Sequence, residues 1–195
     1  MKFAGPIALL LLLAAASAAL AAGRDNAGPS ASRCGGQLWR LKTLSDLRRN
    51  KVKLDPRATA AGAIAKRPFP RPIPRVRRTP FQGQAWEVVA QVTDYRFESG
   101  GVRLILHDGG SYMNAVIPTP SCLTRRTRAR TDLLKTWRFF LSECTQANSG
   151  GWQKLGAIVY VRGVGFWSQR GPKRGSARNG AELYPVTGLR VVSGC

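Results

Sequence analysis

Groups that carry out hydrolysis are scarce in this sequence. Among its 195 residues there are 10 Asp and Glu and a single His. Metal-assisted cleavage of a phosphodiester needs clustered carboxylates around a divalent cation, a general base, and an arginine that stabilises the developing charge. The acids expected on strands or their turns are Asp94, Glu98, Asp108 and Glu182, and no two of them have the spacing of a metal-binding loop. We expect no metal site and no cofactor.

The single imidazole offers a second route to acid–base chemistry. His107 precedes Asp108-Gly109-Gly110, and a His–Asp couple can exchange protons near neutral pH. Asp followed by two glycines is also typical of a tight turn, and this interpretation is favoured, with His107 on the surface of a strand. The sequence contains no nucleophile elbow, phosphate-binding glycine loop or dinucleotide fingerprint. Enzyme activity is therefore the less favoured function class.

Basic residues point to a different chemistry, the binding of anions. The sequence has 31 Lys and Arg and a formal net charge of +21, which attracts anionic partners whatever the fold. Proteins that hold single-stranded nucleic acid combine a cationic groove with aromatic rings that stack on bases. The candidates for such a surface are Arg96, Arg103, Arg162, Arg170, Lys173 and Arg174, with the aromatic residues Tyr95, Phe166 and Trp167. Counterion release acts on any polyanion, so composition leaves nucleic acid and acidic envelope polymers equally open as partners.

Alternation of apolar and polar residues predicts the strands that must position these groups. Trp86, Val88, Ala90 and Val92 alternate with polar residues, and the phase of the alternation changes at Asp94, which indicates a bulge. Two glycine-containing turns then lead into strands expected over residues 102–107 and 111–117, which completes a three-stranded meander. Further strands are expected over 157–167 and 183–192, joined by a basic loop.

The stretch between the third and fourth of these strands has helical spacing. Its apolar residues are Leu133, Leu134, Trp137, Phe140 and Leu141, and we expect a helix over residues 124–143. Three strands, a helix and two strands is the element order of the OB-fold, a five-stranded Greek-key barrel with one helix between strands 3 and 4. We therefore predict a mainly β protein with an OB-like barrel. An α+β open antiparallel sheet with one covering helix has the same linear order and is the alternative.

Four cysteines form an even set without the paired spacing of a zinc site. They are Cys34, Cys122, Cys144 and Cys195, and in an exported chain two disulfides are favoured. A helix over residues 124–143 would separate its ends by about 30 Å, far more than the about 7 Å that a disulfide allows between α-carbons. Cys122 is then not bonded to Cys144. Cys34 is expected to bond to Cys122 or to Cys144.

The N-terminal part of the chain has the features of a secretory signal peptide over residues 1–21. Lys2 is followed by an apolar run from Ile7 to Leu13 and by Ala19-Leu20-Ala21, a small-x-small cleavage pattern. We expect a secreted or extracytoplasmic protein, in the periplasm or cell envelope, with no transmembrane anchor after signal removal. Residues 22–33 are expected to be disordered, 34–65 to form an N-terminal extension, 66–81 a Pro/Arg-rich linker, and 82–195 the OB-like domain.

Four short motifs carry a resemblance to a known family. They are Cys34-Gly35-Gly36, Lys42-Thr43-Leu44-Ser45-Asp46, Gly163-Val164-Gly165-Phe166, and the stretch Asn179-Gly180-Ala181-Glu182-Leu183-Tyr184-Pro185-Val186. With them the chain resembles a family of uncharacterised exported bacterial proteins over most of residues 34–195, and a looser similarity is to the micrococcal-nuclease barrel. The family's last strand reads Glu-Leu-His-Pro-Val, and here Tyr184 stands at the His position. The family's His-Gly-Gln-Thr-Gly loop is also replaced, by residues 169–173.

The resemblance implies an OB-like domain and no known reaction. Glu182 belongs to its recurring motif and is the one candidate site acid, with a structural salt bridge as the favoured alternative. The sequence as a whole predicts an exported, non-enzymatic binding module for anionic polymers. A divergent metal-dependent hydrolase on a nuclease-like barrel and an envelope module that binds another protein are the alternatives.

Overall fold

The computed structural model describes residue 1, residues 34 and 36, and residues 38–145, 150–169 and 173–195. The expected signal peptide and the segment 22–33 lie outside the described residues, apart from Met1. The described part is mainly β, with six strands in one mixed sheet and three α-helices. The helices are α1 (Trp39–Lys42), α2 (Ala61–Ala65) and α3 (Arg130–Glu143), and single turns of 3-10 helix span Arg49–Lys51 and Pro120–Cys122. The strands are β1 (Lys53–Ala58), β2 (Gln84–Glu98), β3 (Gly101–Asp108), β4 (Ser111–Pro118), β5 (Gln153–Trp167) and β6 (Ala181–Ser193).

The strand pairings form a closed circuit. β2, β3 and β4 are the expected antiparallel meander, β4 pairs with β6 in parallel, and β5 pairs antiparallel with both β6 and β2. Both pairings of β2 shift register between Val92 and Asp94, which confirms the expected bulge. The parallel pairings β1–β2 and β4–β6 make the sheet mixed, whereas the alternative expected an antiparallel one. β1 pairs in parallel with the first residues of β2 and lies at the edge of the sheet, with Pro56 near its middle.

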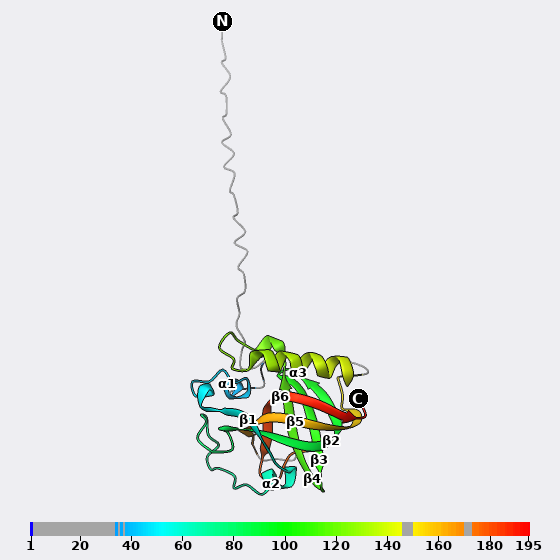
Figure 1. Cartoon of the computed structure of the whole chain (residues 1–195). Helices are drawn as coiled ribbons and strands as arrows, with labels where there is room; N and C mark the ends of the chain where they lie inside the picture. The colour runs from blue at the N-terminus through cyan, green and yellow to red at the C-terminus, as the bar shows by residue number, and fades with distance from the viewer. Residues whose placement is uncertain (2–33, 35, 37, 146–149, 170–172) are drawn as a thin grey trace.

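The main core lies on the inner face of this curved sheet. Val88, Leu104, Met113, Val159 and Leu183 are fully or almost fully buried there, one from each strand of the circuit. Figure 1 shows α3 across one end of the sheet and α2 at the opposite end. Each helix adds side chains to this core, Phe140 from α3 and Ala61 and Ile64 from α2.

Helix α3 begins later in the chain than the sequence predicts. We expected it over residues 124–143, but it begins at Arg130, because the preceding residues bond elsewhere. The amide of Thr124 donates to Thr127 Oγ1, and the amide of Arg128 donates to the carbonyl of Leu44. Ala129 then adopts a positive φ of 55°, which places the chain outside the helical region. None of the helices in the described part of the chain has the length and apolar character needed to span a bilayer.

Two disulfides staple the ends of the described chain to the fold. Cys34 is bonded to Cys122 and Cys144 to Cys195, with α-carbons 5.5 and 4.5 Å apart. These pairings confirm that Cys122 is not bonded to Cys144. The helix, although shorter than expected, still separates the two residues.

The Pro/Arg-rich segment over residues 66–81 contacts the sheet and α1. Phe69 packs edge-on against Trp167, with ring centroids 6.0 Å apart. The guanidinium of Arg77 is buried, donates to the carbonyls of Leu41 and Gln82, and forms an ion pair with Asp46. The segment therefore forms part of the surface around α1.

Candidate functional site: a basic cleft and its neighbours

A cleft of about 380 Å³ brings together residues from four separate parts of the chain. We call it the basic cleft, and its lining is Arg96, Glu98, Arg103, Trp152, Lys173 and Arg174. Arg96 on β2 and Arg103 on β3 are direct cross-strand neighbours, an arrangement in which like charges repel. Glu98 offsets this repulsion, because its Oε1 accepts hydrogen bonds from Arg96 Nη2 at 2.7 Å and Arg103 Nε at 3.0 Å.

Behind the cleft, Arg103 also reaches a buried carboxylate. Its Nη1 lies 3.3 Å from Glu182 Oε1, and the Glu182 side chain is only 3% exposed. Burial alone would lower the pKa of Arg103, but the charges of Glu182 and Glu98 raise it above its ordinary value. Burial alone would raise the pKa of Glu98, but hydrogen bonds and charge from Arg103 and Arg96 hold it below its usual range. Both shifts favour the charged forms of Arg103 and Glu98 at neutral pH.

On the other side of the cleft, Trp152 orients two guanidiniums. The guanidinium carbons of Arg96 and Arg174 lie 4.8 and 5.2 Å from the centre of the half-buried indole ring, within the range of cation–π attraction. Arg174 Nη2 is also held by Asp94 Oδ1 at 2.7 Å, and exposed Lys154 binds the same oxygen. These guanidiniums are therefore fixed before any ligand arrives.

A lysine from the N-terminal part of the chain completes this charge network. Lys42 of α1 holds its Nζ 5.4 Å from the ring centre of Phe166 and 5.2 Å from that of Tyr184. Burial lowers the pKa of Lys42, although the charge of Glu182 opposes this shift. Burial also raises the pKa of Tyr184, so its hydroxyl stays protonated. With Lys42 and Lys154 included, six basic side chains face the three carboxylates of Asp94, Glu98 and Glu182, which leaves an excess of positive charge.

The structure gathers some of the predicted site residues and separates others. Arg96, Arg103, Lys173 and Arg174 line the cleft, and Glu182 lies behind it in the salt bridge that was its favoured interpretation. Arg162 lies elsewhere, on β5, and forms an ion pair with Glu87 of the neighbouring β2. Arg170 lies outside the described residues.

The predicted stacking rings need correction. Tyr95, Phe166 and Trp167 are 2%, 3% and 2% exposed, so none of them presents a face to a base. Tyr95 packs edge-on against Phe140 of α3, with centroids 5.3 Å apart, and belongs to the main core. Phe166 lies in a second cluster together with Leu41 of α1. The segment that contains α1 thus covers an aromatic ring that strand periodicity alone would predict to be exposed to solvent.

Three residues near the cleft were missed by the sequence analysis. Trp152 lines the cleft from a distant segment, and no local pattern marks it. Lys42 lies behind the cleft near Glu182, and the sequence motif that contains it gave no indication of this position. Asn114 is fully buried on β4, opposite Glu182 in the β4–β6 register, and its amide N and O have no hydrogen-bond partner among the described residues. A polar residue amid the apolar run Met113–Ile117 was the only available signal for it.

The remaining groups considered for catalysis, His107 and Asp108, lie at the β3–β4 turn. Asp108 Oδ2 accepts a hydrogen bond from the amide of Ala61 at the start of α2, and Gly109 and Gly110 adopt positive φ values, as the expected turn requires. The His107 ring lies 4.5 Å from that of Tyr112 across the β3–β4 pair. In the described part of the chain, no three His, Cys, Asp or Glu residues gather in a group that could hold a metal ion.

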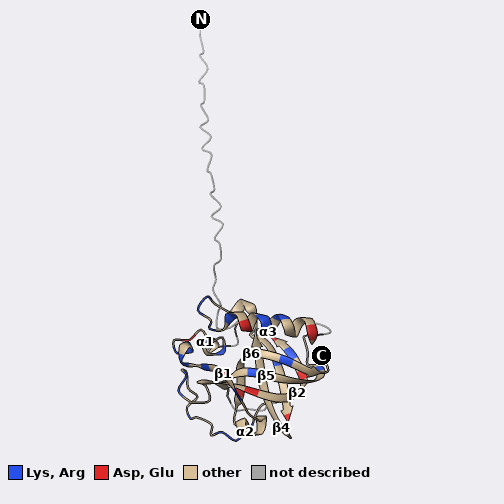
Figure 2. Ribbon diagram, in the orientation of Figure 1, with Lys and Arg blue, Asp and Glu red and all other residues tan. Residues whose placement is uncertain are grey.

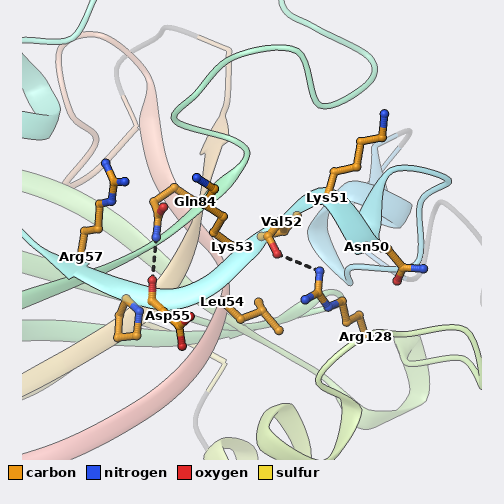
Figure 3. Close-up of a pocket in the computed structure, with 10 residues that line it drawn as sticks. Asn50, Lys51, Val52, Lys53, Leu54, Asp55, Arg57, Gln84 and Arg128 are labelled. Atoms are coloured by element: carbon orange, nitrogen blue, oxygen red, sulfur yellow. Dashed lines mark hydrogen bonds between the residues drawn. The ribbon is translucent and has the colours of Figure 1, made fainter.

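Figure 2 shows basic residues on many elements, including α3 and the long loops, while acidic residues are fewer. A second basic surface, the β1 groove, has a volume of about 650 Å³. Figure 3 shows Lys51, Lys53 and Arg57 extending to the same side of β1. Arg128 lines the same groove and donates to the carbonyls of Arg49 and Val52, at 2.8 Å each. Among the described side chains, none forms an ion pair with the exposed lysines of the β1 groove. The guanidiniums of the basic cleft, in contrast, are held by ion pairs.

A third surface, which we call the mixed groove because polar and apolar residues line it, adjoins the basic cleft and shares Lys173 with it. Its volume is about 510 Å³. Its apolar lining includes Leu38 beside α1, Pro72 and Ile73 of the Pro/Arg-rich segment, and Phe166, and the polar residues Ser168 and Gln169 line it as well. Lys42, Arg75 and Lys173 supply its charge, and no carboxylate is among the described residues that line it.

Comparison with known proteins gives no family assignment. No family model and no curated protein matches the sequence. A search of solved structures found similarity to a protein assigned as an aspartyl-tRNA synthetase from Leishmania major Friedlin, with 12% identity and a TM-score of 0.44. The similarity covers 74% of this chain and 22% of that one, so this chain spans less than a quarter of its length.

Proposed function

We propose that this protein is an exported, non-enzymatic binding module that holds anionic polymers in the basic cleft. The observation that carries the proposal is the convergence of basic side chains on this cleft, three of them guanidiniums held by carboxylates, where positive charge exceeds negative charge. Guanidiniums held in place by carboxylates and an indole lose little conformational freedom when an anionic group binds. The two disulfides support a location outside the cytoplasm.

We further propose that the closed circuit of pairings is an OB-like barrel. On OB-folds, polymers lie across strands 2 and 3, between the loop that joins strands 1 and 2 and the loop that joins strands 4 and 5. β3 and β4 take the places of strands 2 and 3 in this chain, and Lys173 and Arg174 lie between β5 and β6. The basic cleft would then lie on the binding face of the barrel.

The test is fluorescence anisotropy with the oxidised chain in EDTA, using labelled single-stranded DNA and a labelled acidic glycan across a range of salt. We expect log affinity to fall linearly with log salt. For DNA, the double variant Lys173→Ala/Arg174→Ala should lower the slope by about 1.4, at about 0.7 per lost phosphate contact.

A matched control removes the same charge from another surface. Lys51→Ala/Lys53→Ala changes two exposed lysines of the β1 groove and should leave the slope nearly unchanged. Equal losses in the two variants would mean diffuse attraction to the whole surface and would contradict a defined site. Absence of binding at low salt would overturn the proposal.

A further inference from the structure

Two neighbouring loops carry aliphatic side chains that the described core does not bury. Leu47 is 94% exposed and Val76 is 38% exposed, and neither belongs to a core cluster. Removing apolar surface from water is favourable, so a leucine that is almost fully exposed gains most from a contact that covers it.

Hydrogen bonds and an ion pair hold these two loops together. The buried Arg77 guanidinium binds Asp46 Oδ2 at 3.1 Å, and Arg48 Nη1 donates to the carbonyl of Arg77 at 3.0 Å. The amide of Arg48 also donates to Asp46 Oδ1 at 3.0 Å. Leu47 and Val76 each adjoin one of the two residues joined by the Arg48–Arg77 bond, so both aliphatic residues are carried by one fixed substructure.

The charge of this substructure is almost all positive. We call residues 46–49 and 75–78 the loop pair, and of its eight residues five are Arg, one is Asp and two are the aliphatic residues above. The Asp carboxylate is already paired with a buried guanidinium. Arg48, Arg75 and Arg78 are exposed and form no ion pair with a described side chain. The loop pair therefore presents aliphatic side chains among cations that are available to a partner.

We infer that the loop pair contacts the surface of a membrane that contains anionic lipids, with Leu47 entering the apolar layer and the exposed guanidiniums on the headgroups. A bilayer offers both features at once, because its charged headgroups lie directly above hydrocarbon. The strength of such a peripheral contact grows with the buried apolar area and with the attraction between basic residues and anionic lipids.

Other partners fit the loop pair less well. An anionic polymer in water has no apolar layer that could cover Leu47. Two aliphatic side chains also fall far short of the about 800 Å² that each partner buries in a stable protein–protein interface. A bilayer needs no larger complementary surface, since a single apolar side chain can enter it.

Membrane contact is separate from the proposed binding of polymers. Arg75 also lines the mixed groove, but no residue of the loop pair lines the basic cleft. Leu47→Ser should therefore leave the affinity for labelled single-stranded DNA unchanged in the anisotropy assay. Either activity can be lost while the other remains.

The experiment is cosedimentation of the full oxidised chain with vesicles of phosphatidylcholine alone, or of phosphatidylcholine and phosphatidylglycerol in equal parts. We expect the anionic vesicles to be bound about a hundredfold more tightly, at about fivefold for each of three exposed guanidiniums. On anionic vesicles, Leu47→Ser should lower the partition coefficient about tenfold, as for the loss of one buried leucine. Arg75→Gln/Arg78→Gln should lower it about 25-fold.

Each variant has a matched control. Val192→Ser changes an aliphatic residue of β6 that is 55% exposed and lies outside the loop pair, and it should leave the partition coefficient unchanged. Lys135→Gln/Arg138→Gln removes two positive charges from α3 and should cost less than Arg75→Gln/Arg78→Gln. Urea unfolding of Leu47→Ser should match that of the wild type, because so exposed a side chain contributes little packing.

Three results would overturn the inference and leave the proposed function standing. The first is failure of the wild type to bind anionic vesicles more tightly than neutral ones. The second is an equal effect of Leu47→Ser and Val192→Ser, which would mean that no leucine enters the bilayer. The third is an equal effect of the two charge variants, which would mean diffuse attraction of the whole surface.

Discussion

The buried ion pair between Arg103 and Glu182 allows a quantitative test of how the cleft is built. The Arg103 side chain is 16% exposed and that of Glu182 3%, so replacing Arg103 by Met leaves a carboxylate buried without its guanidinium partner. Removing one partner of a buried pair costs about 3–5 kcal/mol, and we expect about 3 kcal/mol here because Lys42 remains nearby. With a urea m-value of about 2 kcal/mol/M, this corresponds to a midpoint lowered by about 1.5 M.

The assay is urea unfolding of the oxidised chain, followed by tryptophan fluorescence. Adding Glu182→Gln to Arg103→Met removes the stranded charge, so the double variant should be more stable than Arg103→Met alone. Arg162→Met breaks a more exposed ion pair, with the Arg162 side chain 53% exposed, and should cost less than about 1 kcal/mol. The reasoning is refuted if Arg103→Met costs no more than Arg162→Met, or if the double variant is no more stable than Arg103→Met.

Three further predictions concern stability. Because the pKa of Glu98 is lowered in the folded protein, its ionised form stabilises the fold above the ordinary pKa of 4.5, and this contribution is lost as the pH falls through the lowered value. The difference in unfolding free energy between the wild type and Glu98→Gln should therefore shrink between pH 7 and pH 3. A difference that grows towards pH 3 would contradict this sign. Replacing Cys34 and Cys122 by Ser removes a crosslink with a sequence separation of 88 and should lower the unfolding free energy by about 4.6 kcal/mol. The same change at Cys144 and Cys195, with a separation of 51, should lower it by about 4.1 kcal/mol, and urea unfolding measures both. A loss below about 1 kcal/mol would argue against the entropic account. Gly165→Ala places a Cβ 2.2 Å from the carbonyl oxygen of Phe81 and should lower stability by about 1–3 kcal/mol in thermal unfolding. Gly150→Ala, whose added Cβ has no heavy atom of the described residues within 4 Å, should have little effect.

Local patterns in the sequence were sufficient for the meander and its bulge. The phase change at Asp94 predicted the register shift, and Asp108-Gly109-Gly110 predicted the turn, because both depend on neighbouring residues alone. The strand β1 was missed. Its residues Lys-Leu-Asp-Pro-Arg-Ala show no alternation, since all but Leu54 are exposed, and the strand forms only because β2 offers an edge.

The candidate site was partly predictable for the same reason. Arg96 and Arg103 face one another through the β2–β3 register, which the meander itself implies. Trp152 meets Arg96, and Lys42 comes near Glu182, only through tertiary packing, so no spacing rule could place either residue there. For Phe166 and Tyr184, strand periodicity predicts the wrong exposure. It assigns this outer face of the sheet to solvent, whereas α1 covers it.

The position of Pro56 limits how two copies of this chain can associate. β1 forms the edge of the sheet, and edge strands with free amide groups are where separate molecules join into larger sheets. Proline has no amide hydrogen to give, so a strand from a second molecule cannot bond continuously along this edge. Under the proposed function, copies crowded side by side on a polyanion would thereby be protected against joining through β1 and would stay individually exchangeable.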